Sequence, residues 1–306
     1  MVGPRYGPSG RGAAAGGRRR TACAAGARMR GRPGAESGGL FASAAADYAR
    51  YRPGIPSEAV RLLAGAVKDV ARPILLDLGC GTGQVAAALL SAPAHVARVD
   101  LVDPDPGMLR EATEVLAPLL GDSPAGFHCG RAEDFTPPFD GYRADLVTCA
   151  RAFHWMPRPA VLTMADRVTS PGASMAIMGD GSLWTYQAQW TADLQRLIQS
   201  YLGPERRAGT AGAYTEPGRR YEDDLAESAF SDVSEHRFPV RRTWTPAAVV
   251  GYLRSTSFAR PALFGDLHAR FEQEAHLLLE EHARSEGLIE DAVFTVLLAR
   301  RPGGDR

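Results

Sequence analysis

The sequence predicts an α/β fold in which helices cover both faces of a parallel sheet. Short apolar runs bounded by glycine or proline alternate with helical patterns from residue 57 to residue 180. The apolar runs hold few polar residues, which is typical of strands buried on both faces. Strands and helices that alternate in this way form parallel βαβ units. Ligands of such sheets bind beyond the carboxyl ends of the strands.

The elements of this alternation can be placed in order along the chain. Residues 40–51 are expected to form helical turns that end at Pro53 and Pro56, and a helix begins near Ser57 as N-cap with Glu58 in its first turn. The predicted strands lie at 74–78, within 95–103, within 125–135, within 144–155 and at 174–180. The helices between them are expected at 84–91, 106–120 and 159–169, and the last strand follows a turn at Ser170-Pro171-Gly172.

From Gly181 onward the alternation is less regular. Residues 182–230 contain seven aromatic residues and a run rich in glycine, proline and arginine, so we expect an insertion over the sheet edge that is partly a flexible loop. The remaining elements are a strand at 233–244, a helix with Thr245 as N-cap and Pro246 as first residue, an amphipathic helix at 267–283 and a strand at 293–301. Residues 40–306 are therefore predicted to be one domain with helical or aromatic additions at 182–230 and 245–286.

Charge is distributed unevenly along the chain. Residues 1–39 hold eight arginines and one acid, a net charge of +7, and the other 27 basic and 34 acidic residues give −7. An acidic domain does not suit a phosphate backbone, so a nucleic-acid partner is not expected. The basic leader fits a transit peptide, an interaction tail or a disordered extension upstream of the true start, for which Met29 is a candidate. We favour the disordered extension.

Cysteine usage and hydropathy limit the class further. The four cysteines form no CxxC pair, and no histidine stands at ligand spacing, so neither a metal site nor a disulfide framework is predicted. No stretch approaches the roughly 18 apolar residues of a membrane span, and the leader lacks the apolar part of an export signal. A cytoplasmic location is expected.

The stretch "ILLDLGCGTGQ" at residues 74–84 carries the main functional signal. Glycines at 79, 81 and 83 let the backbone approach a ligand, and the following helix directs free N–H groups toward it. A dinucleotide-binding G-x-G-x-x-G motif would need glycine at position 84, where this chain has Gln84. Asp77 would repel a pyrophosphate but suits a cationic amino group beside a carboxylate, as in the amino-acid end of S-adenosylmethionine.

With that motif, the sequence resembles the class I S-adenosylmethionine-dependent methyltransferases of the small-molecule branch (the type 11 or type 25 kind). The resemblance runs from about Tyr48 to Arg301 and includes "YARYRPGIP", "VDPDPGML", "GRAEDF" and "ARAFHWM" in the family's order. It implies a Rossmann-like, doubly wound, mostly parallel seven-stranded sheet with an antiparallel last strand. S-adenosylmethionine is the implied cofactor, with no metal.

The resemblance also implies roles for individual residues. Asp77, Gly79 and Gly81 would line the methionine part of the cofactor, with Thr82 and Gln84 near its carboxylate. Asp103 would bind the ribose hydroxyls, and we prefer it to Asp100 because "DPDPGML" follows it. The other implied cofactor contacts are Tyr48, Arg52, Met108, Ala132, Glu133 and Ala150. Arg131 stands where the family often has an acid that contacts the adenine amine.

Most of these residues also have a purely structural interpretation. Asp103 could be only a helix N-terminal acid, and Met108 only a core residue. Tyr48, Tyr51 and Arg52 could close over the cofactor or simply cap the sheet. His268, His276 and His282 are expected on a solvated helix face.

The acceptor side of the site is less defined. His154, just past the fourth strand, stands where a general base would be expected, or else it forms a wall of the pocket with Trp155. Tyr51, Trp155, Trp184 and Trp190 are the candidate acceptor-binding residues, although a core role for the aromatic residues of 182–230 fits equally well.

The predicted activity is methyl transfer to an oxygen or nitrogen of a small organic acceptor, such as a specialised metabolite. "ARAFHW" replaces the N/D-P-P-Y run that marks many enzymes acting on amides and nucleobases. Two alternatives are a non-catalytic cofactor-binding regulator and a nicotinamide-dependent oxidoreductase. The oligomeric state is not predicted.

Overall fold

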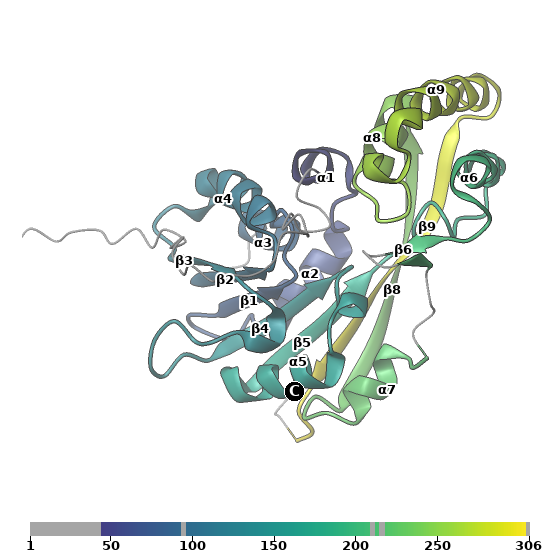
Figure 1. Cartoon of the computed structure of the whole chain (residues 1–306). Helices are drawn as coiled ribbons and strands as arrows, with labels where there is room; N and C mark the ends of the chain where they lie inside the picture. Colours follow the sequence, from purple (N-terminus) through teal and green to yellow (C-terminus); the bar gives the residue numbers. More distant parts are fainter. Residues whose placement is uncertain (1–43, 93–95, 209–211, 214–217, 304–306) are drawn as a thin grey trace, which may run out of the picture. The chain divides into compact units, whose positions relative to one another are not determined.

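The apolar runs form the strands of one seven-stranded sheet in the computed structural model (Figure 1), which describes residues 44–92, 96–208, 212–213 and 218–303. The leader at 1–39 and part of the glycine-rich run before residue 218 lie outside these residues. In chain order the strands are β1 (Ile74–Leu78), β2 (Arg98–Asp103), β3 (Ala125–Cys129), β4 (Ala144–Ala150), β5 (Thr169–Gly179), β8 (Asp232–Trp244) and β9 (Leu288–Arg300). A two-stranded hairpin joins β6 (Arg207–Ala208) to β7 (Gly212–Ala213).

The sheet order is β3-β2-β1-β4-β5-β9-β8. The first five strands pair in parallel, whereas β9, the last strand of the chain, lies antiparallel between β5 and β8. The predicted fold class is therefore confirmed. The chain order reverses at β1 and β4, and in open α/β sheets such a point is where ligands bind.

Helices cover both faces of the sheet, as its two apolar faces require. The helices are α1 (Ala45–Tyr51), α2 (Ser57–Ala66), α3 (Gln84–Ser91), α4 (Pro106–Leu120), α5 (Arg158–Val168), α6 (Gln189–Leu202), α7 (Tyr221–Ala226), α8 (Pro246–Arg254) and α9 (His268–Ser285), with short 3-10 turns at 132–134, 153–155, 261–263 and 265–267. One core cluster joins α2, α3 and α4 to the sheet, and a second joins α5 and α7 to the opposite face. No described helix is both long enough and apolar enough to span a bilayer.

A third core lies at one end of the long β8 and β9 ladder, which pairs as far as Trp244 with Leu288. Helices α6, α8 and α9 pack together there (Figure 1), and α1 packs against α8. A side chain on Gly251 of α8 would come within 2.3 Å of the Tyr51 ring, so this glycine is needed for the close approach. The third core thereby places α1 and α8 beside the carboxyl ends of β1 and β4.

Several local expectations need correction. Strand β5 begins at Thr169 and continues through Ser170-Pro171-Gly172, where we expected a turn, because a register irregularity opposite β4 accommodates these residues. Helix α2 starts at Ser57, whose side chain makes no cap hydrogen bond, and Pro56 takes the N-cap position. The predicted Thr245 cap is confirmed, since its hydroxyl accepts a hydrogen bond from the Ala248 N–H at 3.2 Å.

Candidate functional site

The glycine-rich loop connects β1 to α3 at the point where the sheet order reverses. Gly79, Gly81 and Gly83 all have positive φ angles, 61°, 53° and 77°. A Cβ at Gly79 would lie 2.5 Å from the Ala152 Cβ, so the loop can pass the segment after β4 only with glycine here. The loop leads directly into α3 at Gln84, whose first-turn N–H groups are the donors that an anionic group could use.

Asp77 occupies an unusual position for a charged residue. Its side chain is 1% exposed, and Thr148, its register partner on β4, donates a hydrogen bond to Oδ1 at 2.7 Å. The other oxygen, Oδ2, is buried and has no hydrogen-bond partner among the described residues. Burial, partly offset by the Thr148 hydrogen bond and reinforced by the nearby Asp103, raises the pKa of Asp77 to about 7. A ligand with a cationic donor group would supply the hydrogen bond that this carboxylate oxygen lacks.

Asp103, at the end of β2, faces the same glycine loop. Its Oδ2 accepts a hydrogen bond from the Gly81 N–H and its Oδ1 accepts one from the Asp105 N–H, both at 2.9 Å. Asp105 is the N-cap of α4, because its Oδ1 accepts hydrogen bonds from Gly107 and Met108. Asp103 is therefore not that helix's capping residue. Burial raises its pKa.

Asp100 serves a different purpose from Asp103. Both of its oxygens are bound by the Arg98 guanidinium, at 2.7 and 2.8 Å, and His128 contacts Oδ1 at 2.8 Å. The Arg98 and His128 partners keep the pKa of Asp100 below its ordinary value despite its burial. With its charge satisfied internally, Asp100 is not available to a ligand, which agrees with the preference for Asp103 in the sequence.

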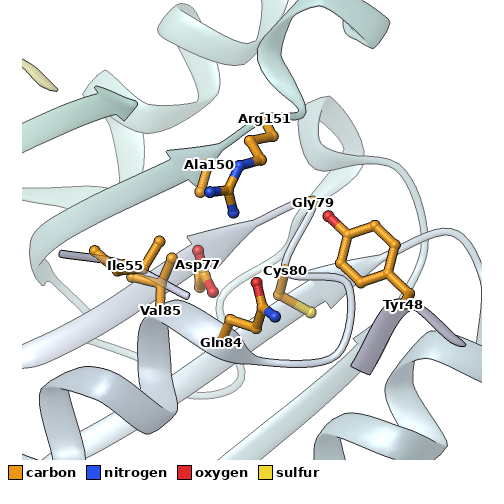
Figure 2. Close-up of a pocket in the computed structure, with 9 residues that line it drawn as sticks. All are labelled: Tyr48, Ile55, Asp77, Gly79, Cys80, Gln84, Val85, Ala150 and Arg151. Atoms are coloured by element: carbon orange, nitrogen blue, oxygen red, sulfur yellow. The ribbon is translucent and has the colours of Figure 1, made fainter. Parts of the chain in front are cut away.

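A hollow beside the glycine loop brings together residues from α1, β1, α3 and β4. Asp77 on β1 and Arg151, which directly follows β4, point into it, and Gln84 lies between Asp77 and the Tyr48 ring (Figure 2). It is lined by Tyr48, Ile55, Asp77, Gly79, Cys80, Gln84, Val85, Ala150 and Arg151. The Gln84 amide donates to the Arg52 carbonyl at 3.1 Å and so attaches the segment after α1 to α3. Five of the predicted cofactor residues therefore share one hollow.

The predicted adenine-side residues lie farther along the loop edge. Met108 is 3% exposed and Ala132 is 4% exposed, so their side chains belong to the packed interior. The Glu133 carboxylate pairs with Arg131 at 2.5 Å, which gives the unexpected Arg131 a local partner. Thr82 is buried, and its hydroxyl has no partner among the described residues.

His154 and Trp155 lie in a short helical turn after β4, and both are exposed. Their rings pack at 4.7 Å, and Trp155 is 46% exposed. Although the residue is exposed as a whole, desolvation of its ring, with the positive charges of Arg206 and Arg52, lowers the pKa of His154 to about 4. The imidazole is therefore neutral at physiological pH and is a weak base.

A second hollow adjoins the first and shares Arg151 with it. It is lined by Arg52, Pro53, Arg151, Asp180, Gly181, Tyr186, Trp244 and Tyr252. Arg151 has φ = 55° and is the single non-glycine residue with positive φ in the described part of the chain. Its guanidinium binds Asp180 through Nε at 2.7 Å and Nη2 at 3.2 Å, and its N–H donates to the Met178 carbonyl. These contacts hold the strained residue in place.

The acceptor candidates of the sequence are not the residues that line this second hollow. Trp190 is 3% exposed and its indole N–H donates to the Ile289 carbonyl, so it is a core residue, which corrects the expectation of a pocket role. Tyr51 packs on Gly251, and Trp184 packs edge-on against Phe258 at 5.5 Å. Asp180, by contrast, was missed, although an acid after the apolar run "SMAIMG" gives the same signal as Asp77.

Two of the three histidines expected on a solvated face have partners. His282 contacts Asp193 at 2.9 Å and so connects α9 to α6. His268 lies near Glu272 at 3.3 Å and beside the Phe264 ring. Only His276 is exposed as expected.

The residues around the first hollow fit the cofactor that the resemblance implies. The buried, unpartnered Asp77 Oδ2 is placed to accept from an ammonium group, and the glycine loop leaves backbone exposed where a Cβ would not fit at Gly79. No group of three or more metal-ligating side chains occurs among the residues that the structure describes.

Comparison with known proteins places this geometry in context. Residues 75–172 match the family model described as a methyltransferase domain. Uncharacterised methyltransferases of Mycobacterium tuberculosis and Mycobacterium bovis are 28% identical over 187 residues, which cover 60% of this chain and 64% of theirs. The match thus spans just under two thirds of the length of these relatives.

Among solved structures, the chain is similar to a proposed type II methyltransferase from Anaeromyxobacter dehalogenans. The TM-score is 0.51 at 22% identity, and the match covers 82% of this chain and 98% of that one. This similarity supports the fold that the sheet order shows.

Proposed function

We propose that this chain, which contains a class I S-adenosylmethionine-dependent methyltransferase domain, moves a methyl group to an oxygen or nitrogen of a small organic acceptor, such as a specialised metabolite. The observation that carries the proposal is the buried Asp77 carboxylate, with one oxygen unpartnered, above a glycine loop with three positive φ angles. A pyrophosphate would be repelled there, whereas an amino-acid group would supply the missing donor.

The residues at the carboxyl ends of the strands suit successive parts of the cofactor. Asp77 would accept from the amino group, and the N–H groups at the start of α3 would face the carboxylate. Asp103 holds the Gly81 N–H and retains free lone pairs, with which it would accept from the ribose hydroxyls. When bound, the cofactor supplies a methyl group already activated by its sulfonium.

The protein then has to exclude water, orient the acceptor and, for an alcohol, receive a proton. His154 is the candidate base named from the sequence, and with a pKa of about 4 it would be deprotonated but weakly basic at neutral pH. A wall role for His154 with Trp155 fits this low basicity better. The chemistry therefore favours an acceptor whose nucleophile is ionised before it binds or loses its proton to water.

Calorimetric titration with S-adenosylhomocysteine and with NAD tests the proposal. We expect micromolar or tighter binding of S-adenosylhomocysteine and none of NAD. Tight NAD binding without a response to S-adenosylhomocysteine would instead support an oxidoreductase. A screen of small acceptors that measures S-adenosylhomocysteine release then distinguishes an enzyme from a cofactor-binding regulator. A cytoplasmic location and the lack of a nucleic-acid partner stay predictions.

A further inference from the structure

The second hollow shares Arg151 with the first, and its polar groups indicate what kind of ligand it suits. Arg52 projects from the end of α1 and makes three hydrogen bonds across to α8 and the residue after it. Nε donates to the Ser255 hydroxyl at 3.0 Å, Nη2 to the Ser255 carbonyl at 2.8 Å, and Nη1 to the Tyr252 hydroxyl at 3.4 Å. All three acceptors are neutral.

Aromatic rings enclose the rest of this guanidinium. Its carbon lies 4.9 Å from the Tyr48 ring centroid and 4.6 Å from that of Tyr252. Cation–π contacts of this kind hold the cation in place but do not neutralise it. Arg52 makes no ion pair with any carboxylate in the described part of the chain. It is a half-buried, pre-positioned cation whose counter-ion is missing.

The other charged side chains that line the hollow, Arg151 and Asp180, belong to an ion-pair network that is balanced within itself. Asp180 is shared by Arg151 and by Arg242, whose Nη2 lies 2.6 Å from Oδ2. Arg242 also binds Glu290, and Glu290 accepts from the Trp244 indole N–H at 2.6 Å. Arg151 and Arg242 are thus matched by Asp180 and Glu290, so the positive charge of Arg52 is left over. One negative charge on a ligand would balance it.

The rings that line the hollow are already packed, so the space suits a small polar group. Trp244 and Tyr252 pack edge to face with ring centroids 5.5 Å apart, and both are almost fully buried. The Tyr186 hydroxyl donates to the Gly181 carbonyl at 2.9 Å, which fixes a third ring of the lining. A carboxylate is small enough to fit beside Arg52 without displacing these rings.

We infer that the second hollow receives one carboxylate of the methyl acceptor, which pairs with Arg52. This inference rests on the proposed function. It moves Arg52 from the cofactor, where the resemblance assigned it, to the acceptor. The carboxylate serves as an anchor, and the methylated atom lies elsewhere on the same compound.

The test uses the full chain and two probes of equal shape, benzoate and benzamide. Their Kd values are measured by ligand-observed NMR, with and without saturating S-adenosylhomocysteine. We expect wild type to bind benzoate at least about tenfold more tightly than benzamide, the scale of charge-assisted pairing. Arg52→Gln should bring the two within about threefold of each other. The control Arg50→Gln, which changes an exposed arginine in the last turn of α1, should behave as wild type.

The Kd of S-adenosylhomocysteine shows which carboxylate Arg52 binds, that of the acceptor or that of the cofactor. If Arg52→Gln weakens S-adenosylhomocysteine about tenfold and leaves the benzoate preference unchanged, Arg52 holds the cofactor and the inference is wrong. It is also wrong if wild type shows no preference for benzoate. Because the probes can be titrated without S-adenosylhomocysteine, failure of wild type to bind S-adenosylhomocysteine identifies failure of the proposed function separately.

Loss of the Ser255 contacts in Arg52→Gln could loosen α1 from α8, so its melting temperature is measured first. Should that variant not fold, Arg52→Met replaces it, because it keeps an apolar stem between the Tyr48 and Tyr252 rings but removes the charge. We expect Arg52→Met to bind benzoate and benzamide within about threefold of each other. A preference equal to that of wild type would overturn the inference.

Discussion

Asp77 should make binding of S-adenosylhomocysteine depend on pH close to neutrality. In the free protein, burial raises the pKa of this carboxyl to about 7, so part of the population is protonated under ordinary assay conditions. A protonated carboxyl cannot pair with the ligand's ammonium group. Binding therefore selects the ionised form and releases a proton where Asp77 was protonated.

The size of the effect follows from that pKa. About nine tenths of the Asp77 side chains are protonated at pH 6, half at pH 7 and one tenth at pH 8. Because affinity follows the ionised fraction, it should rise roughly tenfold from pH 6 to pH 8, or about 1.4 kcal/mol. The gain is present above pH 7 and is lost as the pH falls through it.

Titration calorimetry at pH 6, 7 and 8, in two buffers with different ionisation enthalpies, measures both the affinity and the protons released. We expect release of about 0.9 proton at pH 6 and about 0.1 at pH 8. Asp77→Asn should bind weakly with no pH dependence in this range. Asp103→Asn should weaken binding by about 1–3 kcal/mol and move the pH dependence to lower pH, since the Asp103 charge helps to raise the pKa of Asp77.

Equal Kd values at pH 6 and pH 8, together with heats that do not depend on the buffer, would refute this reasoning. They would mean that Asp77 does not face the ammonium group, and that the unpartnered Oδ2 has another explanation. A pH slope that persists in Asp77→Asn would assign the titrating group to another residue.

Three further predictions concern stability and turnover. Because the pKa of Asp77 is raised, its stabilising contribution is fully present below about pH 4 and is lost as the pH rises through 7, where a charged carboxylate is buried. Asp77→Asn removes that buried charge and should stabilise the free protein at pH 8 by about 2–4 kcal/mol in urea unfolding. Glu290→Gln removes a fully buried charge that faces Arg242 and should cost about 3–5 kcal/mol, whereas the exposed neighbour Asp291→Asn should cost under about 0.5 kcal/mol; equal losses would contradict this contrast. His154→Ala should lower turnover less than tenfold with cofactor affinity retained, and a loss of roughly a hundredfold would establish His154 as the base.

The fold could be predicted well because its signals are local. A strand buried on both faces requires a continuous apolar run, and residues 74–78 supply one, so β1 lies where the sequence places it. Pro106 at the first position likewise fixed the start of α4. Strand β5 was predicted to start late, since Pro171 and Gly172 normally mark a turn and only pairing with β4 and β9 reveals the irregularity.

The site could be predicted only in part, because some of its contacts join residues that are far apart in the sequence. Asp77 and Asp103 follow apolar strands, and their neighbours in sequence already indicate a ligand. The partners of Arg151 and Arg242 are 29 and 62 residues away from them at Asp180, and no local period records such a pairing. Trp190 was assigned to a pocket because composition cannot tell a wall from a core, which packing of α6 on α9 decides.

One sequence signal, a carboxylate at the end of an apolar strand, therefore leads to different roles according to its partners. Asp77 has one neutral donor and a free oxygen, so its charge is open to a cation. Asp180 has two guanidinium partners, so its charge is neutralised within the protein and it orients Arg151 and Arg242. That pairing in turn leaves Arg52 without an acid. The uncompensated charge is therefore negative at Asp77 in the first hollow and positive at Arg52 in the second. An acceptor that brings its own negative charge to the Arg52 side would meet a cationic cofactor group held from the Asp77 side, so the charges of the two ligands would attract each other as well as the protein.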